Sequence, residues 1–564
     1  MDYSVASTDS TQLYVFIKRL RQRQQSITGR QNDDKKNKAL WFLTGTPTST
    51  DFESLIKNGG KSLEQFDVYG MDHRGTGNSH RLGCPSNQAE STGSEGGVAI
   101  TDNEMHQCSQ SLSQVLSNRL DLFSSSYASL DLASVLEALK DEYESTHVTG
   151  VGYGTYWLSR FLQIIPEHDD LIQSAIMDSV ISTTSGDDKD PDANGQRTVL
   201  TNWDKDVNSV GLNLLQNYCN NQTVCYEKLK RAPVKFLTST FESVFQNQTC
   251  SRLTQTSSKK KKDEEKAVTE NELRRFLGSL VLRPSTRDMI PAILYRLHRC
   301  DPDVDVPTLQ HAFQFFRSKE SQSTVNNAPI SVDGSYSKVW ESLVTFSELF
   351  PRDLSLASPS VVEAVYNTTF MGTGESVSKA KTLLVSQFPI YEPDVFFNKA
   401  PQPKIPVLML NGDLDAKTPI QYARHQATAM GAPTNVRLVE LPSAAHNTLL
   451  YSHQRNSSVT CGMEIMLSFL NNGAELATVD TSCLARIITP NFTGSAEMDK
   501  LFFGVADIYE DAYEAPEIEK TVNLYLFIGV EAGTVVASII IICCLIYYIV
   551  QLKDKSSDYE EIEE

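Results

Sequence analysis

The chain has 564 residues, a formal net charge of −19 at pH 7 and 40% hydrophobic residues. This length allows two or more domains or one large elaborated domain, and the composition is that of a globular protein rather than a disordered one. The negative charge predicts a soluble, self-repelling surface and argues against nucleic acid as a partner. The residue spacings match neither a metal site nor a dinucleotide-binding loop, so we expect no metal and no cofactor.

The first third of the chain alternates predicted strands and helices. TQLYVFIKRL (residues 11–20) alternates apolar and polar residues, ALWFL (39–43) is an apolar run, and FDVYGMD (66–72) is another. LASVLEALKDEYE (132–144) has helical spacing, and SAIMDSVI (174–181) is a further apolar strand. Strands that alternate with helices indicate a parallel α/β sheet.

The stretch HVTGVGYGTYW (147–157) has the layout of a nucleophile elbow. In the G-x-S-x-G elbow, a serine hydroxyl stands on a strained turn between a strand and a helix, above a parallel sheet. The five positions here read Gly150-Val151-Gly152-Tyr153-Gly154. Gly152 therefore occupies the nucleophile position and offers no hydroxyl.

Composition changes after Gly186, where the polar loop GDDKDPDAN begins. Some two hundred residues of helical pattern follow, including the solvated loop SSKKKKDEEK, and strand character returns in IPVLMLNGDLD and VRLVELPSAAH. We expect one α/β sheet interrupted by a helical insertion. The expected core comprises residues 1–186 and 401–505, and the insertion comprises residues 187–400.

Asp415 and His446 each follow a predicted strand, in the order nucleophile, acid, base that the α/β-hydrolase fold uses. In such a triad the imidazole takes the hydroxyl proton, while the carboxylate fixes its tautomer and stabilises the imidazolium. We expect Asp415 and His446 to lie within hydrogen-bond reach. We expect the imidazole to face Gly152 across a gap about the size of the missing side chain.

Several motifs in this order resemble the proline iminopeptidase and tripeptidyl aminopeptidase family of serine peptidases. The matching stretches are DHRGTGNS with Cys84-Pro85, GVGYGTYWLSRFLQIIP, IMDSVI, GDLDAKTP, and SFLNNGAELATVDTSC ending at Cys483. The resemblance covers about residues 12–490 and is weakest across the insertion. It implies an α/β-hydrolase fold, with a mostly parallel sheet flanked by helices and a helical cap. It also implies hydrolysis of peptides from the free N-terminus, or of small amides and esters.

Two departures from the family pattern concern the chemistry. The first is Gly152, and the second is the loop Gly45-Thr46-Pro47-Thr48, where the family carries G-G-P-G. That loop supplies one oxyanion-hole amide in the family, so the candidate donors here are the amides of Thr46 and Tyr153. Losing two glycines replaces permissive backbone with residues that resist positive φ.

Three functions stay open on this basis. The first is a membrane-anchored pseudo-hydrolase that binds a peptide, a small amide or ester, or a protein partner. The second is an active peptidase or esterase, with either an unrecognised nucleophile or a sequence error at codon 152. The third is a structural membrane glycoprotein whose cleft is vestigial.

Cysteines and sequons bear on the cellular compartment. Eight cysteines precede residue 524, and we expect them to pair as sequence neighbours: Cys84–Cys108, Cys219–Cys225, Cys250–Cys300 and Cys461–Cys483. An even count at local spacing suits disulfides in an oxidising compartment. N-x-S/T sequons, which permit glycosylation without proving it, occur at Asn221, Asn247, Asn367, Asn456 and Asn491.

The C-terminal region predicts a membrane anchor. An acidic linker (506–523) precedes the apolar stretch LYLFIGVEAGTVVASIIIICCLIYYIV (524–550), and an acidic tail (551–564) follows. As a helix, 25 of these residues would reach roughly 37 Å, enough to cross a bilayer with some tilt. We expect a single-pass protein whose globular part is extracellular or lumenal. The start MDYSVASTDSTQ shows no apolar signal segment, so two interpretations stay open: a sequence truncated at its N-terminus, which the cysteines favour, and a tail-anchored protein facing the cytosol.

Overall fold

The computed structural model describes residues 13–21, 37–45, 51–84, 87–91, 93–97, 100–112, 114, 118–165, 168–184, 200–255, 267–318, 336–351 and 353–513. The chain divides into two units, residues 1–513 and 514–564, and every described residue belongs to the first. The predicted membrane span (524–550) and the acidic tail lie outside the described residues. Within the described ranges, no helix is long and apolar enough to cross a membrane.

The described strands form one sheet in the order β1-β3-β2-β4-β5-β6-β7. Their bounds are β1 Ile17–Leu20, β2 Asn37–Thr44, β3 Phe66–Met71, β4 Tyr143–Val151, β5 Ser174–Asp178, β6 Val407–Gly412 and β7 Val436–Leu441. Among these strands, β1 and β3 pair in antiparallel fashion, and the remaining neighbours are parallel. The mostly parallel sheet predicted from the sequence is confirmed.

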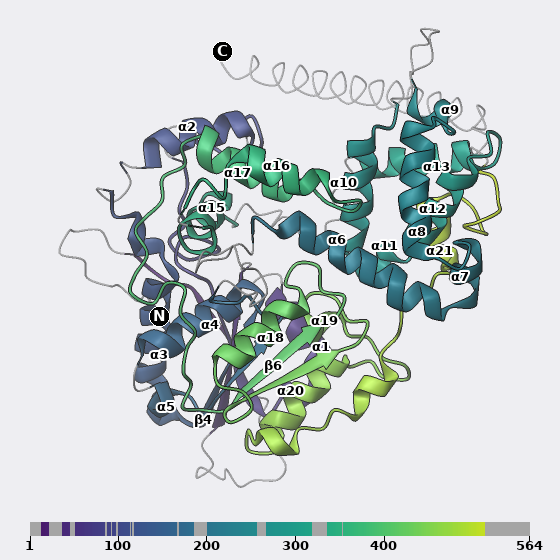
Figure 1. Cartoon of the computed structure of the whole chain (residues 1–564). Coiled ribbons are helices and arrows are strands. Elements are labelled where there is room, and N and C mark those ends of the chain that lie inside the picture. Colours follow the sequence, from purple (N-terminus) through teal and green to yellow (C-terminus); the bar gives the residue numbers. More distant parts are fainter. Residues whose placement is uncertain are drawn as a thin grey trace, which may run out of the picture. The chain divides into compact units, whose positions relative to one another are not determined.

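Helices cover both faces of this sheet (Figure 1). On one face α3 (Ser125–Leu139), α4 (Tyr153–Ile164) and α18 (Ile420–Ala429) share an apolar cluster with Trp41 and Val148 of the sheet. On the other face α1 (Asp51–Gly59), α19 (Thr448–Tyr451) and α20 (Cys461–Asn471) pack on Leu40 and Phe42. Because both faces are covered, the inner strands are apolar runs rather than alternating sequences.

The turn from β4 to α4 depends on glycine. A Cβ at Gly150 would lie 2.4 Å from the carbonyl oxygen of Gly154, and a Cβ at Gly154 would lie 1.9 Å from the carbonyl oxygen of Leu43. Gly152 between them adopts φ 55° and ψ −118°, a backbone conformation that side chains rarely adopt. The stretch is therefore an elbow in its geometry as well as in its sequence.

The residues between β5 and β6 are helical or lie in connecting loops wherever the structure describes them. The insertion contains α6 Trp203–Asn213, α7 Thr223–Lys228, α8 Pro233–Phe241, α9 Ser251–Thr254, α10 Glu270–Val281, α11 Pro284–Arg287, α12 Ile290–Arg299, α13 Asp305–Arg317, α15 Lys338–Val344, α16 Pro359–Asn367 and α17 Glu375–Val385. Three π-helical segments extend its described helices: η5 Leu214–Tyr218, η7 Glu242–Gln246 and η8 Thr345–Leu349. In the core, α2 Asp102–Leu112 and α5 His168–Leu171 complete the described α-helices apart from α21.

The end of the described chain packs with the insertion rather than with the sheet, which differs from the predicted core boundary at residue 505. Phe502 of α21 (Ala496–Phe502), Phe503 and Tyr509 belong to the apolar cluster formed by the insertion helices. The fully buried Arg296 donates from Nε to the carbonyl oxygen of Ile508 at 2.6 Å. Aromatic side chains in this segment find apolar surface on the insertion, and the buried arginine fixes its backbone.

Four disulfides join the cysteines as sequence neighbours, as predicted. The bonded pairs are Cys84–Cys108, Cys219–Cys225, Cys250–Cys300 and Cys461–Cys483. Their Cα separations run from 5.2 to 5.6 Å, within the range that disulfide geometry allows. The first and last lie in the core, and the other two lie in the insertion.

The elbow packing yields a stability prediction. Gly154→Ala should destabilise the protein by at least the upper end of the roughly 1–3 kcal/mol that overpacking costs, because the new methyl meets backbone that cannot rotate away. Gly83→Ala is the control, because its Cβ would meet only the end of the Arg81 side chain, at 3.2 Å. Denaturant unfolding of both variants measures the difference, and equal stabilities would contradict the close approach of α4 to β2.

Candidate active site

Gly152 and His446 face each other at the edge of the sheet. Gly152 follows β4, and His446 lies in the loop between β7 and α19. A Cβ at Gly152 would lie 3.0 Å from Nε2 of His446 and 3.3 Å from its Cε1. The structure thus brings the nucleophile position and the candidate base together.

Asp415 holds the other ring nitrogen of His446. Nδ1 of His446 lies 3.1 Å from Oδ2 of Asp415. Thr418 donates its hydroxyl to the same Oδ2 at 2.6 Å, and its backbone amide donates to Oδ1 at 2.8 Å. Full burial raises the pKa of Asp415, but the hydrogen bonds and the neighbouring His446 outweigh burial and leave the pKa below its usual value. An ionised Asp415 fixes the imidazole with its proton on Nδ1, so Nε2 is the atom that faces Gly152.

The space between His446 and Gly152 is slightly tight for a side chain at residue 152. The 3.0 Å separation from a Cβ at residue 152 is already shorter than an ordinary contact of about 3.4 Å. A serine at residue 152 would therefore need the imidazole to shift by a few tenths of an ångström.

The end of β5 ties the elbow to the histidine loop. The carbonyl oxygen of Asp178 accepts from the Gly152 amide at 2.9 Å, and the Asp178 carboxylate accepts from the amides of Thr448 and Leu449. Ser179 accepts from the amide of Asn447 at 2.7 Å. Two neighbouring residues of β5 and its loop thus position both sides of the site. Sequence reasoning passed over them, although the stretch IMDSVI was already a matched motif.

Tyr153 places its backbone amide at the site, whereas its side chain points toward Ser125 and His73. Its amide begins α4 directly after Gly152, which is the place of the second oxyanion donor in an elbow. Its phenol oxygen lies 2.7 Å from Oγ of Ser125 and 3.2 Å from Nε2 of His73. Burial raises the pKa of Tyr153 well above its usual value, so the phenol stays protonated. The other candidate donor, Thr46, lies outside the described residues, so the oxyanion-loop prediction remains a prediction.

His73, in the turn after β3, is a buried residue that the sequence analysis did not single out. Its Nδ1 lies 2.6 Å from the carbonyl oxygen of Arg74, and its ring packs 4.9 Å from that of Trp157 and 4.7 Å from that of Trp340. Trp340 belongs to α15, so His73 and Tyr153 join the elbow to the insertion. Burial lowers the pKa of His73 to about 3, and its hydrogen bond to Arg74 offsets only part of that effect.

Comparison with known proteins found similarity among solved structures alone. No family model and no curated protein matches the chain. Solved structures similar to it include a malate-bound esterase from Thermogutta terrifontis (11% identity, 84% of this chain and 100% of that chain, TM-score 0.29) and a bromoperoxidase from Bacillus anthracis (10%, 78% and 90%, 0.30). A lipase in an open form is also similar (13%, 84% and 99%, 0.30).

Values this low support no conclusion about function. The chain's own strand order, its elbow and the order Gly152, Asp415, His446 define an α/β-hydrolase fold.

The buried His73 yields a prediction about pH. The unfolded chain binds a proton at this residue below pH about 6.5, whereas the fold resists protonation down to pH about 3. The contribution of His73 to the free energy of unfolding is therefore fully present above pH about 6.5. Between pH about 6.5 and pH about 3 it falls by about 1.4 kcal/mol for each pH unit. His73→Asn, which keeps an N–H donor for Arg74, should remove this contribution to the slope.

The exposed His106→Asn is the matched control. The free energy of unfolding, measured by urea titration between pH 7 and pH 4.5, gives both slopes. An unchanged slope in His73→Asn would show that the imidazole is not held neutral.

Proposed function

We propose that this protein is a pseudo-hydrolase that binds a peptide, a small amide or ester, or a protein partner without hydrolysing it. The proposal rests on one observation: His446 and Asp415 form a hydrogen-bonded pair, but the imidazole faces Gly152, where a Cβ would lie 3.0 Å from Nε2 and no hydroxyl is present. An α/β-hydrolase acylates its serine in the first chemical step. Without that oxygen there is no acyl-enzyme.

Hydroxyl groups near residue 152 along the chain are engaged elsewhere. Thr155 donates its hydroxyl to the carbonyl oxygen of Gly152 at 2.7 Å and accepts from the Ile181 amide. Thr149 is buried, with its hydroxyl directed to the sulfur of Met466 at 3.9 Å. The phenol of Tyr153 bonds to Ser125. Each is part of the packing that forms the elbow, which argues against a substitute nucleophile.

The intact Asp415–His446 pair favours a second candidate, a slow hydrolase. Nε2 of His446 could take a proton from a water molecule that attacks the substrate carbonyl carbon directly, with the leaving amine or alcohol protonated by the imidazolium. In subtilisin, a serine protease with the same kind of triad, removal of the serine lowers turnover by about 10⁶. The resemblance to aminopeptidases suggests peptides with a free N-terminus, or small amides and esters, as substrates for this candidate.

We also propose that residues 524–550 anchor the protein in a membrane and that the globular part is extracellular or lumenal. The four disulfides support this orientation, because disulfide bonds are rare in the reducing cytosol. The asparagines of all five sequons are also exposed. The other orientation is a tail anchor with the globular part in the cytosol.

Membrane extraction gives a prediction for the anchor. After alkaline carbonate washing, the full chain should stay in the membrane pellet, and a version ending at residue 513 should be released. A full chain that washes off like the shortened one would rule out the anchor.

Reversion of Gly152 tests the pseudo-hydrolase proposal. Gly152→Ser alone should show little turnover of aminoacyl and short-peptide amides, because the new side chain competes with the imidazole for space and the loop at Thr46 and Thr48 lacks its glycines. Losing one oxyanion donor typically costs about 10²–10³ in rate. A triple variant with Thr46→Gly and Thr48→Gly added should recover more than the sum of the separate changes, because nucleophile and oxyanion hole act together.

Gly152→Ala is the matched control, because it adds the Cβ without the hydroxyl and reports the steric effect alone. Steady-state turnover of all variants is measured with the purified globular part. A single Gly152→Ser revertant as fast as the triple variant would show that only the serine was lost. Brisk turnover by the unmodified protein would overturn the proposal.

A further inference from the structure

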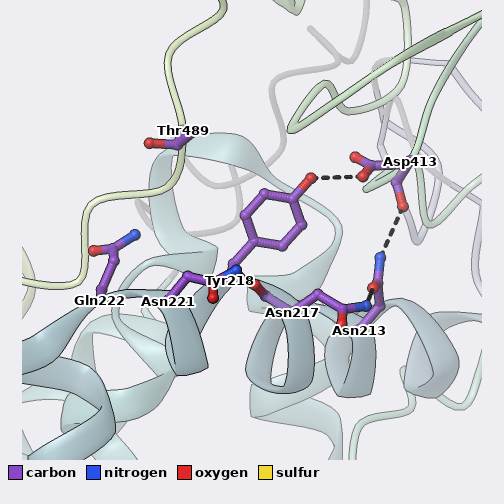
Figure 2. A pocket seen from close by; sticks show the side chains of 7 residues that line it. All are labelled: Asn213, Asn217, Tyr218, Asn221, Gln222, Asp413 and Thr489. Atoms are coloured by element: carbon purple, nitrogen blue, oxygen red, sulfur yellow. Dashed lines mark hydrogen bonds between the residues drawn. The ribbon is translucent and has the colours of Figure 1, made fainter.

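A cavity of about 470 Å³ lies where the insertion meets the core (Figure 2). Polar side chains line it, and Gly152 is not one of the lining residues. We call it the amide pocket. Its lining includes four carboxamides, from Asn213, Asn217, Asn221 and Gln222, together with Tyr218 and Asp413. The carboxamides and the tyrosine come from consecutive turns of α6, η5 and the following segment, whereas Asp413 follows β6 of the core.

Among the described residues that line the pocket, Asp413 is the one charged residue, and both of its carboxylate oxygens already accept hydrogen bonds. The phenol of Tyr218 donates to its Oδ2 at 2.5 Å, and the amide of Ser443 donates to its Oδ1 at 2.7 Å. Figure 2 shows the Tyr218 ring projecting from the helix toward this carboxylate, with Asn213 below it. Within the same described lining there is no Lys, Arg or second carboxylate, which makes the pocket a poor match for an anion or a metal cation.

The carboxamides and the tyrosine ring that line the pocket suit a neutral ligand rich in hydroxyl and amide groups. A carboxamide offers both a donor and an acceptor, so it can pair with a hydroxyl in either sense. An aromatic ring among such groups offers an apolar face of the kind that covers the C–H face of a sugar. The pocket thus fits a sugar residue, and an N-acetylated one would use the amides further.

Asn221 is both a lining residue and the first residue of the sequon Asn221-Gln222-Thr223. Asn221 and Thr223 are exposed, so the acceptor is accessible. Its Nδ2 donates one hydrogen to the carbonyl oxygen of Asn217 at 2.6 Å. Because a glycosylated asparagine keeps one N–H, this bond can persist while the second position on Nδ2 carries a sugar.

We propose that Asn221 carries an N-linked glycan whose first sugar, an N-acetylhexosamine, lies in the amide pocket. In the attachment, Nδ2 bonds to the anomeric carbon of an oligosaccharide activated as a lipid diphosphate. The bond from that carbon to the diphosphate oxygen breaks, the lipid diphosphate leaves, and one amide proton passes to a base of the transferring enzyme. The inference rests on the proposed lumenal location of the globular part.

A sugar in this place would bridge the insertion and the core. It would contact the helical segment at 213–222 and, across the cavity, Asp413 and Thr489. Asp413 lies two residues before Asp415, and Ser443 lies three residues before His446. The glycan would therefore stabilise the two loops that carry the acid and the base.

The test uses the full chain produced in a eukaryotic secretory pathway. Glycopeptide mass spectrometry measures occupancy at all five sequons. Hydrogen exchange measures protection of residues 213–222 and of the loops at Asp413 and Ser443. Thr223→Ala removes the sequon while leaving every lining residue in place, and Ser458→Ala, at another exposed position, removes the Asn456 sequon as the matched control.

We expect Asn221 to be occupied, and we expect faster exchange in these segments for Thr223→Ala and not for Ser458→Ala. Trimming the native protein with an endoglycosidase that leaves a single sugar should preserve the protection, because only the first sugar lies in the pocket. An unoccupied Asn221 with other sequons occupied would overturn the inference alone. So would an occupied Asn221 whose loss leaves exchange unchanged. If none of the five sequons were occupied, the lumenal location would fail and the inference with it.

Discussion

The packing of α4 against β2 and β4 is the constraint on which the site depends. The helix begins so close to the sheet that Gly150 and Gly154 have no room for a side chain. This approach forces the residue between them into positive φ and points it outward, toward the loop after β7. An elbow is a device for presenting a nucleophile. In this protein the turn has the backbone conformation of an elbow, but glycine at residue 152 supplies no nucleophilic side chain.

The residues around Gly152 have the geometry of a catalytic acid–base pair. Asp415 is buried and ionised, Thr418 orients it, and His446 is held with Nε2 toward the elbow. Asp178 and Ser179 bind the elbow and the histidine loop to the same strand end. A buried carboxylate beside an imidazole costs desolvation unless each is well paired, and here both are. These hydrogen bonds explain how the Asp415–His446 pair can be stable in a site that has no catalytic activity.

Much of this architecture could be read from the sequence because its features are local. Glycine spacing identified the elbow, strand-end positions identified Asp415 and His446, and neighbouring cysteines gave the disulfide pairs. Features that depend on contacts between distant segments could not be read in this way. The close approach of His446 to Gly152 is one, and the burial of Tyr153 between His73 and Ser125 is another. The turn after Asp415 is an intermediate case, since an aspartate side chain that accepts from backbone amides two and three residues later, here those of Lys417 and Thr418, is a common local turn.

The central claim is that the site forms no covalent acyl-type intermediate, and covalent labelling tests it most directly. The purified globular part would be treated with an excess of a fluorophosphonate, which phosphonylates an activated serine, threonine or cysteine, and adducts would be mapped by peptide mass spectrometry. The account predicts that no residue is modified, whereas the triple variant Gly152→Ser, Thr46→Gly and Thr48→Gly, run alongside as the positive control, acquires an adduct at residue 152. A stoichiometric adduct on the unmodified protein, lost when His446 is replaced by alanine, would contradict it.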